Sequence, residues 1–389
     1  MTRAQSRGFT IIEFMIAMTL SLLVLAALTG AFVASSRSRA EIEKANEQVE
    51  NGRFALQILT DDLETAGYLS HFNLPIAMTA DTPLRAPADQ AALAPNPWAT
   101  KPNPCTTAAD AASLTLLRGA IPMHVQGYDS LAALDAELDD CLADFKPGTD
   151  IVVVRRTATC VGGTANCPLI AGAAYFQASL CSNGNELGSA AATDYFRLDT
   201  TLGNLNRTQR NCATVAERRQ YLTHIYFIAN NDQAGDNVPT LKRAELGNAA
   251  DPDGFTIVPL AHGIQDLQIE YGIDTEVPGD GAPNAFTTNP DTYNGANCAG
   301  TNAEKTACIS NWRNTMTLRL HLLARNSSQT QDYLDTKIYS LGLNDDGTVR
   351  CARDDVAPAG ECEAFGDRFK RHVYQTTVRM HNPAGLRER

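Results

Sequence analysis

The first 36 residues constrain this chain most, because they join a short basic leader to a long apolar segment that contains a single carboxylate. The leader MTRAQSRG precedes FTIIEFMIAMTLSLLVLAALTGAFVASS, in which Glu13 is the one charged residue. From Phe14 to Ser36 no residue is charged, and at about 1.5 Å per helical residue this stretch reaches roughly 35 Å. That length crosses the hydrocarbon core of a bilayer, so we expect a membrane-spanning helix over residues 9–36.

Glu13 is the first candidate functional residue. A carboxylate in a membrane helix costs on the order of 2–3 kcal/mol at mid-bilayer and less near an interface, so its presence suggests a partner charge. The alternative is that Glu13 only reaches into the headgroup zone. We favour the functional interpretation, because ionisable residues inside membrane segments are usually functional.

The hexapeptide Gly8-Phe9-Thr10-Ile11-Ile12-Glu13 resembles the processing site of type IV prepilins and of type II secretion pseudopilins. An ordinary secretory signal carries its cleavage site after the apolar region, whereas here the order is inverted. The resemblance implies that a prepilin peptidase cuts after Gly8 and methylates Phe9, which removes residues 1–8 and leaves the apolar helix in the mature chain. It also implies that Glu13 pairs with the amino terminus of a neighbouring subunit and thereby sets its register in a filament.

Composition indicates a folded protein that does not bind nucleic acid. The 389 residues are 44% apolar and 20% charged, which is ordinary for globular chains. The formal net charge of −12 argues against DNA or RNA as a main ligand, since phosphate binding needs clustered Lys and Arg.

Ten cysteines all follow the apolar segment, and an even number in an exported region indicates disulfides. Metal binding is the rival interpretation, but no C-x-x-C occurs. Connectivity does not follow from the sequence, and pairing between neighbours is our expectation. The candidates are Cys105, Cys141, Cys160, Cys167, Cys181, Cys212, Cys298, Cys308, Cys351 and Cys362.

A helical period continues beyond the apolar run and predicts one helix to about Ala66, ended by Gly67. Residues 37–69 would form its amphipathic half, with an apolar stripe that packs on a sheet. The stripe consists of Ile42, Val49, Leu56 and Leu63, with Ala45, Gly52, Leu59 and Ala66 in a parallel set.

Residues 70–389 are expected to form an extracytoplasmic α+β head. A short helix is predicted around Leu131–Ala143, and a polar loop from Thr275 to Asn311. The strand pattern lacks a strand–helix–strand rhythm, so we expect an antiparallel sheet on which the long helix packs. The predicted strands are Asp150–Arg156, Tyr221–Ala229, Phe255–Leu260, Ile264–Tyr271, Thr315–Ala324, Leu334–Ser340 and His372–Met380.

The segment from Glu50 to Leu69, ENGRFALQILTDDLETAGYL, resembles the amphipathic helix of PilW-type minor pilins. The blocks His262–Glu276, Trp312–Asn326 and Arg368–Pro383 are similar to that family's later blocks, although the ending Met380-His381-Asn382 departs from its pattern. We expect the residues that carry the first match, Asn51, Arg53, Asp62 and Tyr68, to tie the helix to the head.

No catalytic motif stands out, and we predict that the chain is not an enzyme. The histidines show no H-E-x-x-H pattern, and no nucleophile elbow or phosphate-binding loop occurs. They are His71, His124, His224, His262, His321, His372 and His381.

No cofactor is expected, with calcium as the one possibility considered. Two acidic turns could offer oxygen ligands to calcium, although a plain turn is the favoured interpretation of both. The carboxylates concerned are Asp251, Asp253, Asp345 and Asp346. A third group, Asp274 with Glu276 and Asp280, opens the predicted polar loop.

The resemblance implies a type IV minor pilin of the PilW type that acts in priming or in the tip complex of the pilus. Its partners would be the prepilin peptidase, the major and other minor pilins and the inner-membrane assembly platform, with a tip adhesin as a further candidate. The subunit would span the inner membrane once, with its head in the periplasm, before it joins the pilus. One alternative is a J-like pseudopilin of a type II secretion system; another is a membrane-anchored adhesin or ligand-binding module.

Overall fold

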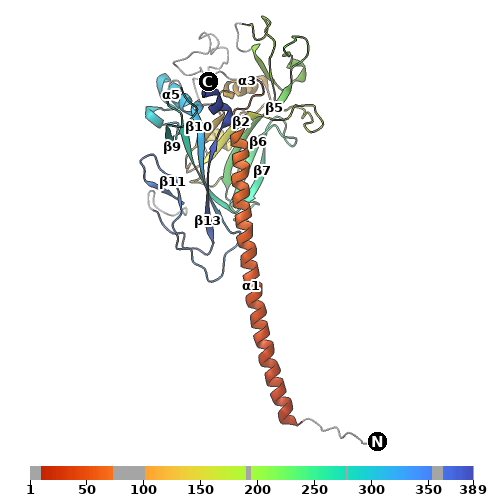
Figure 1. Ribbon diagram of the computed structural model, residues 1–389, viewed down its shortest axis with the longest axis vertical. Coiled ribbons are helices and arrows are strands. Elements are labelled where there is room, and N and C mark those ends of the chain that lie inside the picture. Colours follow the sequence, from red (N-terminus) through yellow and green to blue (C-terminus); the bar gives the residue numbers. More distant parts are fainter. Residues whose placement is uncertain (1–9, 73–100, 190–193, 277–278, 353–361, 389) are drawn as a thin grey trace, which may run out of the picture.

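The computed structural model describes residues 10–72, 101–189, 194–276, 279–352 and 362–388. A long helix, α1 (Ile11–Glu64), projects from a head built of antiparallel sheets (Figure 1). With 54 residues at about 1.5 Å each, α1 is roughly 80 Å long. The predicted single helix is therefore confirmed, and Gly67 follows its end with a φ of +71°. Glycine suits that position because it has no side chain to oppose positive φ.

The head contains two main sheets and a small hairpin, and every strand pairing is antiparallel. The first sheet has the order β1-β2-β5-β3-β4, with β6 beside β5 and β7 beside β6. The second sheet has the order β13-β10-β8-β9, and β11 pairs with β12. The expected α+β class with an antiparallel head is confirmed.

The first sheet comprises β1 (Val125–Tyr128), β2 (Ile151–Thr157), β3 (Tyr175–Ala178), β4 (Phe196–Asp199), β5 (Arg218–Ala229), β6 (Thr240–Leu246) and β7 (Phe255–His262). The remaining strands are β8 (Ile264–Ile273), β9 (Ala285–Thr287), β10 (Thr315–Arg325), β11 (Ser340–Leu343), β12 (Val349–Cys351) and β13 (Arg371–Arg379). The shorter helices are α3 (Ala111–Ala120), α4 (Ala136–Asp139), α5 (Asn302–Arg313) and α6 (His381–Arg387), with 3-10 turns at Leu202–Asn204 and Tyr293–Gly295.

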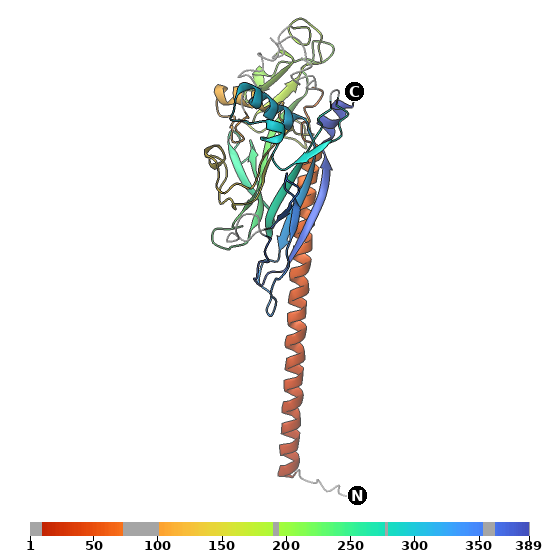
Figure 2. The same ribbon diagram turned by 90° about the vertical axis from the view of Figure 1, so that its left-hand side faces the viewer.

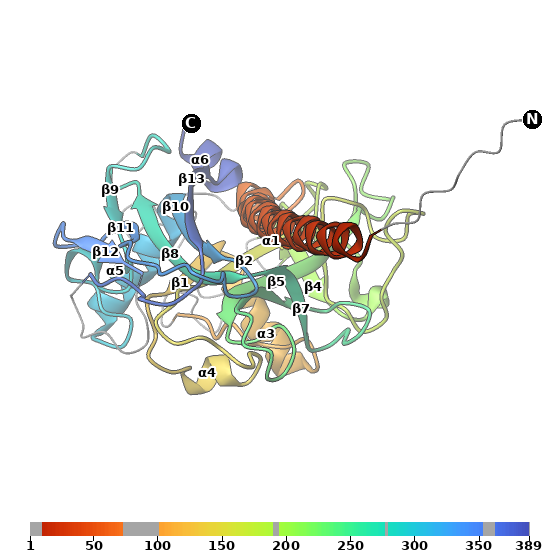
Figure 3. The same cartoon turned by 90° about the horizontal axis from the view of Figure 1, so that it is seen from below.

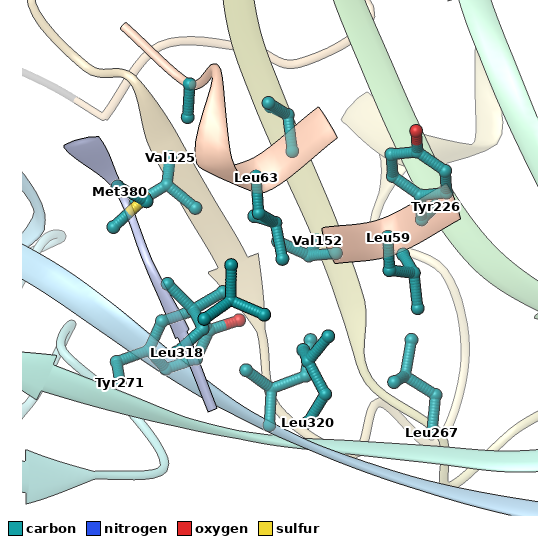
Figure 4. Packing of buried hydrophobic residues seen from close by; sticks show 14 of the residues in the cluster. Leu59, Leu63, Val125, Val152, Tyr226, Leu267, Tyr271, Leu318, Leu320 and Met380 are labelled. Atoms are coloured by element: carbon teal, nitrogen blue, oxygen red, sulfur yellow. The ribbon is translucent and has the colours of Figure 1, made fainter. Parts of the chain in front are cut away.

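The carboxyl-terminal half of α1 packs across both main sheets. Seen from below, it lies between β10 and β13 on one side and β5 and β7 on the other (Figure 3). Leu59 and Leu63 of α1 are fully buried in the largest apolar cluster of the head. In Figure 4 they meet side chains of both sheets. These are Val125, Val152 and Tyr226 from the first sheet and Leu267, Tyr271, Leu318, Leu320 and Met380 from or next to the second.

The buried stripe of α1 differs from the predicted one. Ile42, Ala45 and Val49 are exposed, whereas Leu59, Leu63 and Ala66 are buried as expected. Residues seven apart drift by about 20° per heptad on a straight helix, so a strict seven-residue set cannot stay against one sheet. The buried positions instead follow three- and four-residue steps: Gln48, Gly52, Ala55, Leu59, Asp62 and Leu63.

Six predicted strands are confirmed as β2, β5, β7, β8, β10 and β13. The predicted strand Leu334–Ser340 is wrong, because β11 begins only at Ser340. Asp335 in that segment is buried and pairs with Arg371, so side-chain and loop contacts replace a strand ladder there.

Two other local predictions are also wrong. The helix expected over Leu131–Ala143 shrinks to the single turn α4, where like charges at Asp135 and Asp139 stand four residues apart and disfavour a longer helix. The predicted polar loop Thr275–Asn311 contains β9 and most of α5.

Candidate functional site

The amino-terminal end of α1 holds Glu13 in a reciprocal capping box with Thr10. The Glu13 carboxylate accepts hydrogen bonds from the Thr10 backbone N–H and from the Thr10 hydroxyl, both at 3.0 Å. The Thr10 hydroxyl in turn accepts one from the Glu13 N–H at 3.3 Å. This arrangement satisfies free donors of the first turn and sets a negative charge at the positive end of the helix dipole. The predicted processing residues Gly8 and Phe9 lie outside the described residues.

Among the described residues, nothing covers the apolar half of α1. All of its large apolar side chains from Ile11 to Val33 are exposed. Within the part of the chain that the structure describes, α1 is the one helix long and apolar enough to cross a membrane. So large an exposed apolar surface is a site for lipid or for other protein chains.

Asp62 joins the other half of α1 to the first sheet. Its carboxylate is 2.5 Å from Nε of Arg156 on β2 and accepts a hydrogen bond from the Tyr226 hydroxyl on β5 at 2.8 Å. Nδ1 of His224, also on β5, lies 2.7 Å away. Burial alone would raise the pKa of Asp62, but His224 and Arg156 outweigh it, so the pKa lies well below its usual range. The charged carboxylate therefore fastens the helix to the sheet. We call this group of contacts the Asp62 lock.

The other residues expected to tie α1 to the head contribute unequally. The Tyr68 carbonyl accepts hydrogen bonds from the Thr157 N–H at 2.7 Å and from the Thr157 hydroxyl at 3.0 Å. Arg53 is exposed and Asn51 is half-buried. The structure thus assigns the tie to Asp62 and Tyr68.

The ten cysteines form five disulfides between sequence neighbours, which is the expected pairing. The pairs are Cys105–Cys141, Cys160–Cys167, Cys181–Cys212, Cys298–Cys308 and Cys351–Cys362. Each joins two segments of the head, and loop closure of this kind restricts the unfolded chain.

Asp291 lies beside the Cys298–Cys308 disulfide, so that three potential metal-ligand atoms stand within 4.8 Å of one another. The disulfide withholds both sulfurs from a metal, and the carboxylate has other partners. It accepts a hydrogen bond from Trp312 Nε1 at 2.6 Å and pairs with Lys101 Nζ at 2.8 Å. Burial lowers the pKa of Lys101, against the pull of Asp291. The group serves as a polar anchor for α5.

The residues considered for calcium contact their own turns or other segments of the head. Asp345 accepts hydrogen bonds from the Thr287 hydroxyl at 2.8 Å and the Thr288 N–H at 2.7 Å. Asp346 accepts one from the Thr348 N–H at 2.9 Å. Asp251 lies beside Gly254 within its turn, and Asp253 contributes its carbonyl to Ala108 N–H. That these are plain turns without calcium stays a prediction.

The third acidic group, Asp274 with Glu276 and Asp280, contacts other groups of the chain. Asp274 is fully buried and pairs with Arg387 of α6 at 2.8 Å, while Asp280 accepts a hydrogen bond from the Ala282 N–H at 2.9 Å. Glu276 contributes its carbonyl to Arg387.

The buried histidines serve packing rather than an evident reaction. Burial lowers the pKa of His124 to about 4, and its Nε2 lies 2.9 Å from the Thr315 carbonyl. His321 lies beside Glu270, and His224 belongs to the Asp62 lock. These contacts join strands to each other and to the helix.

Sequence reasoning missed a second buried ion cluster, which holds the segment between β10 and β13 against the head. Arg350 on β12 pairs with Asp129 and Asp150. Asp150 also accepts hydrogen bonds from the backbone N–H groups of Ser130 at 2.9 Å and Ile269 at 2.7 Å. Burial raises the pKa of Asp150 to about 7, against the effect of Arg350. No local pattern marks these residues, because their partners are far apart in the chain.

Two family models match the chain. Residues 225–382 match Type IV Pilus-assembly protein W, and residues 3–29 match the prokaryotic N-terminal methylation motif. The first match runs from β5 to α6 and so includes strands of both main sheets, and the second contains Glu13 and the leader. Neither the curated proteins nor the solved structures contain a significant match.

Proposed function

This chain is a type IV pilin of the PilW type with an N-terminal methylation motif, and we propose that it acts as a minor pilin in the priming or tip complex of the pilus. The observation that carries the proposal is the combination of a membrane-length helix bearing Glu13 with a PilW-type head on the same continuous α1. Families of this kind assemble filaments and are not catalytic, in accord with the absence of a recognised catalytic motif in the sequence.

In the proposed mechanism, cleavage after Gly8 creates a new α-amino group on Phe9, four residues before Glu13. In a low-dielectric setting an amine and a carboxylate attract strongly, and either charge buried alone is costly. Pairing of Glu13 with the amino terminus of a neighbouring subunit therefore rewards the correct register. The exposed apolar half of α1 then packs among other pilin helices.

The capping box gives Glu13 a second role that the test must separate from the first. We expect Glu13→Gln to retain membrane insertion and cleavage but to reduce incorporation into pili, because the charge is lost. Thr10→Ala is the matched control, since it removes the hydroxyl of the cap but leaves the carboxylate. Piliation is counted by electron microscopy, and the mature amino terminus is read by mass spectrometry.

Unchanged pilus number in Glu13→Gln would contradict the register mechanism. Equal defects in both variants would assign Glu13 to helix capping alone. A native chain that still begins at Met1 would contradict processing as a prepilin and favour a membrane-anchored adhesin, whereas a native chain that lacks the apolar segment would contradict both.

A J-like pseudopilin of a type II secretion system shares the processing motif and the helix-on-sheet plan. Deletion of the chain separates the two roles. Loss of pili with normal protein secretion supports the minor pilin, and the reverse outcome supports the pseudopilin.

A further inference from the structure

One end of the head faces the membrane half of α1. Gln48 of α1 donates hydrogen bonds to the carbonyls of Ala324 at 2.7 Å and Lys370 at 3.1 Å, where β10 ends and β13 begins. At the other end of the contact, Asn382 donates to the Ala66 carbonyl at 3.2 Å. β13 therefore runs along α1 away from the membrane half. Of the head, the chain between β10 and β13 extends farthest toward the membrane half of the helix (Figure 2).

The segment 326–335, which we call the basal loop, is fastened to α1. The Thr330 hydroxyl donates a hydrogen bond to the Glu41 carboxylate at 2.8 Å, and Lys370 Nζ lies 2.9 Å from the same oxygen. Lys44 Nζ donates to the Gln329 carbonyl at 3.0 Å. These contacts fix the height of the basal loop along the helix.

That height places the basal loop at the membrane surface. Glu41 follows the last residue of the uncharged run, Ser36, by five positions, which is roughly 7.5 Å along a helix. The headgroup region on each side of the hydrocarbon core is about 5–7 Å thick. A loop fastened at Glu41 therefore meets the outer edge of the headgroups when residues 9–36 span the bilayer.

The surface of this end is suited to an anionic interface. Leu334 in the basal loop is 60% exposed, and Lys337, which follows the loop by two residues, is exposed. Arg368, whose carbonyl accepts a hydrogen bond from the Thr330 N–H at 2.8 Å, is exposed as well. Arg37 and Arg39 extend the exposed basic surface down the helix. The exposed carboxylates of Glu43, Glu47 and Asp332 lie in the same region, and Glu47 accepts a hydrogen bond from the Ser327 hydroxyl at 3.4 Å, but Glu41 is paired with Lys370. A basic and apolar surface at headgroup height contrasts with a chain whose net charge is −12.

We propose that, in the unassembled subunit, the basal loop and Lys337 and Arg368 rest on anionic phospholipid headgroups of the membrane that holds α1. This rests on the membrane anchoring in the proposed function. The contact holds the head at a fixed height above the bilayer. It must be given up when the subunit leaves the membrane for a filament.

The test uses the full chain reconstituted in vesicles that contain phosphatidylglycerol, with a fluorescent label on Ser328→Cys in the basal loop. A matched label on Thr201→Cys reports an exposed position beyond β4. Lipids with a headgroup nitroxide should quench the label at 328 and leave that at 201 bright. Lys337→Glu with Arg368→Glu should lower the quenching at 328 severalfold without bringing it to the level at 201, because α1 still holds the basal loop near the bilayer while each basic charge at an anionic surface is worth about fivefold in occupancy. With the wild type in phosphatidylcholine vesicles, the quenching at 328 should fall in the same way.

Equal quenching at both labels overturns the proposal, as does quenching at 328 that is unchanged in the charge-reversed variant. Excess quenching that appears only at high protein-to-lipid ratio also overturns it and assigns the surface to a neighbouring copy. Flotation with vesicles after a carbonate wash reports separately on α1. Failure to float contradicts membrane anchoring itself, whereas flotation without excess quenching contradicts only the basal contact.

Discussion

At the residue scale, Asp62 carries much of the connection between α1 and the first sheet. Its carboxylate is 4% exposed and faces Arg156, His224 and Tyr226. Asp62→Asn leaves the Arg156 guanidinium without its carboxylate, and loss of one partner of a buried pair costs about 3–5 kcal/mol. We expect a loss toward the lower end, because the Arg156 side chain is 16% exposed. The free energy of unfolding is measured by urea titration in mild detergent.

Asp61→Asn is the matched control for that change. Asp61 is the preceding residue and is exposed, so its substitution should alter stability by less than about 0.5 kcal/mol. Equal effects of the two substitutions would show that the Asp62 contacts do not fasten the helix.

Asp150 gives the head a pH dependence of unusual sign. Its pKa is about 7 when folded, against an ordinary value of 3.8. Between these values the folded chain binds more protons than the unfolded chain, so this residue lowers the free energy of unfolding as pH rises from about 4 to about 7. Asp150→Asn removes the titration. The stability of the wild type minus that of the variant should therefore fall across this range.

Urea titrations at several pH values under non-reducing conditions measure that difference. The exposed Asp140→Asn should follow the wild type across the whole range. A difference between wild type and Asp150→Asn that does not change with pH would contradict the raised pKa.

At the scale of elements, the packing of α1 on β13 depends on Gly52. The ring of Tyr374 occupies the place that a Cβ at this position would need. Gly52→Ala gains about 1 kcal/mol of helix propensity but forces the ring to move, and overpacking costs about 1–3 kcal/mol. We expect a net loss of stability, partly restored by Tyr374→Leu.

Gly30→Ala is the control, because nothing lies within 4 Å of its Cβ position. It should leave the stability of the head unchanged. A stabilising Gly52→Ala would show that α1 does not approach β13 closely in solution. Urea unfolding followed by Trp312 fluorescence checks both variants.

The elements that were predictable from sequence are those with strong local patterns. The charge-free run and the helical period predict α1, the alternation of leucine with polar residues predicts β10, and β-branched residues predict β13. Short strands such as β9 and β12 carry no such pattern, because partners distant in sequence create them. By contrast, α5 carried a readable signal in Thr301 and Glu304, whose reciprocal capping box starts the helix.

The residues that fasten α1 to the head could be predicted from the family resemblance, but their contacts could not. The sequence predicts that Asp62 ties the helix to the head, but its partners on β2 and β5 follow only from the fold. Asp150 and Arg350 were missed, because a buried ion pair between residues 200 positions apart leaves no local trace.

At the scale of the whole molecule, α1 joins the two main sheets into one cooperative unit. Leu59 is fully buried in a cluster that contains Tyr226 of the first sheet and Leu320 of the second. Separate sheets joined by loops would unfold separately, whereas sheets that share a helix and a core lose stability together. The segment between β10 and β13 packs on the second sheet through a small cluster in which Tyr339 and Leu341 join Leu323 of β10.

Leu59→Ala tests whether the two main sheets lose stability together. Truncation of a fully buried leucine costs about 2–5 kcal/mol. We expect hydrogen exchange of the full chain in detergent to accelerate in β5 and β10 by similar factors, because both sheets rely on the same side chain. Leu28→Ala in the exposed half of α1 is the control and should leave exchange in the head unchanged. Acceleration confined to one sheet would mean that the head consists of two independently stable layers, so that α1 could carry one into a filament while the other opens.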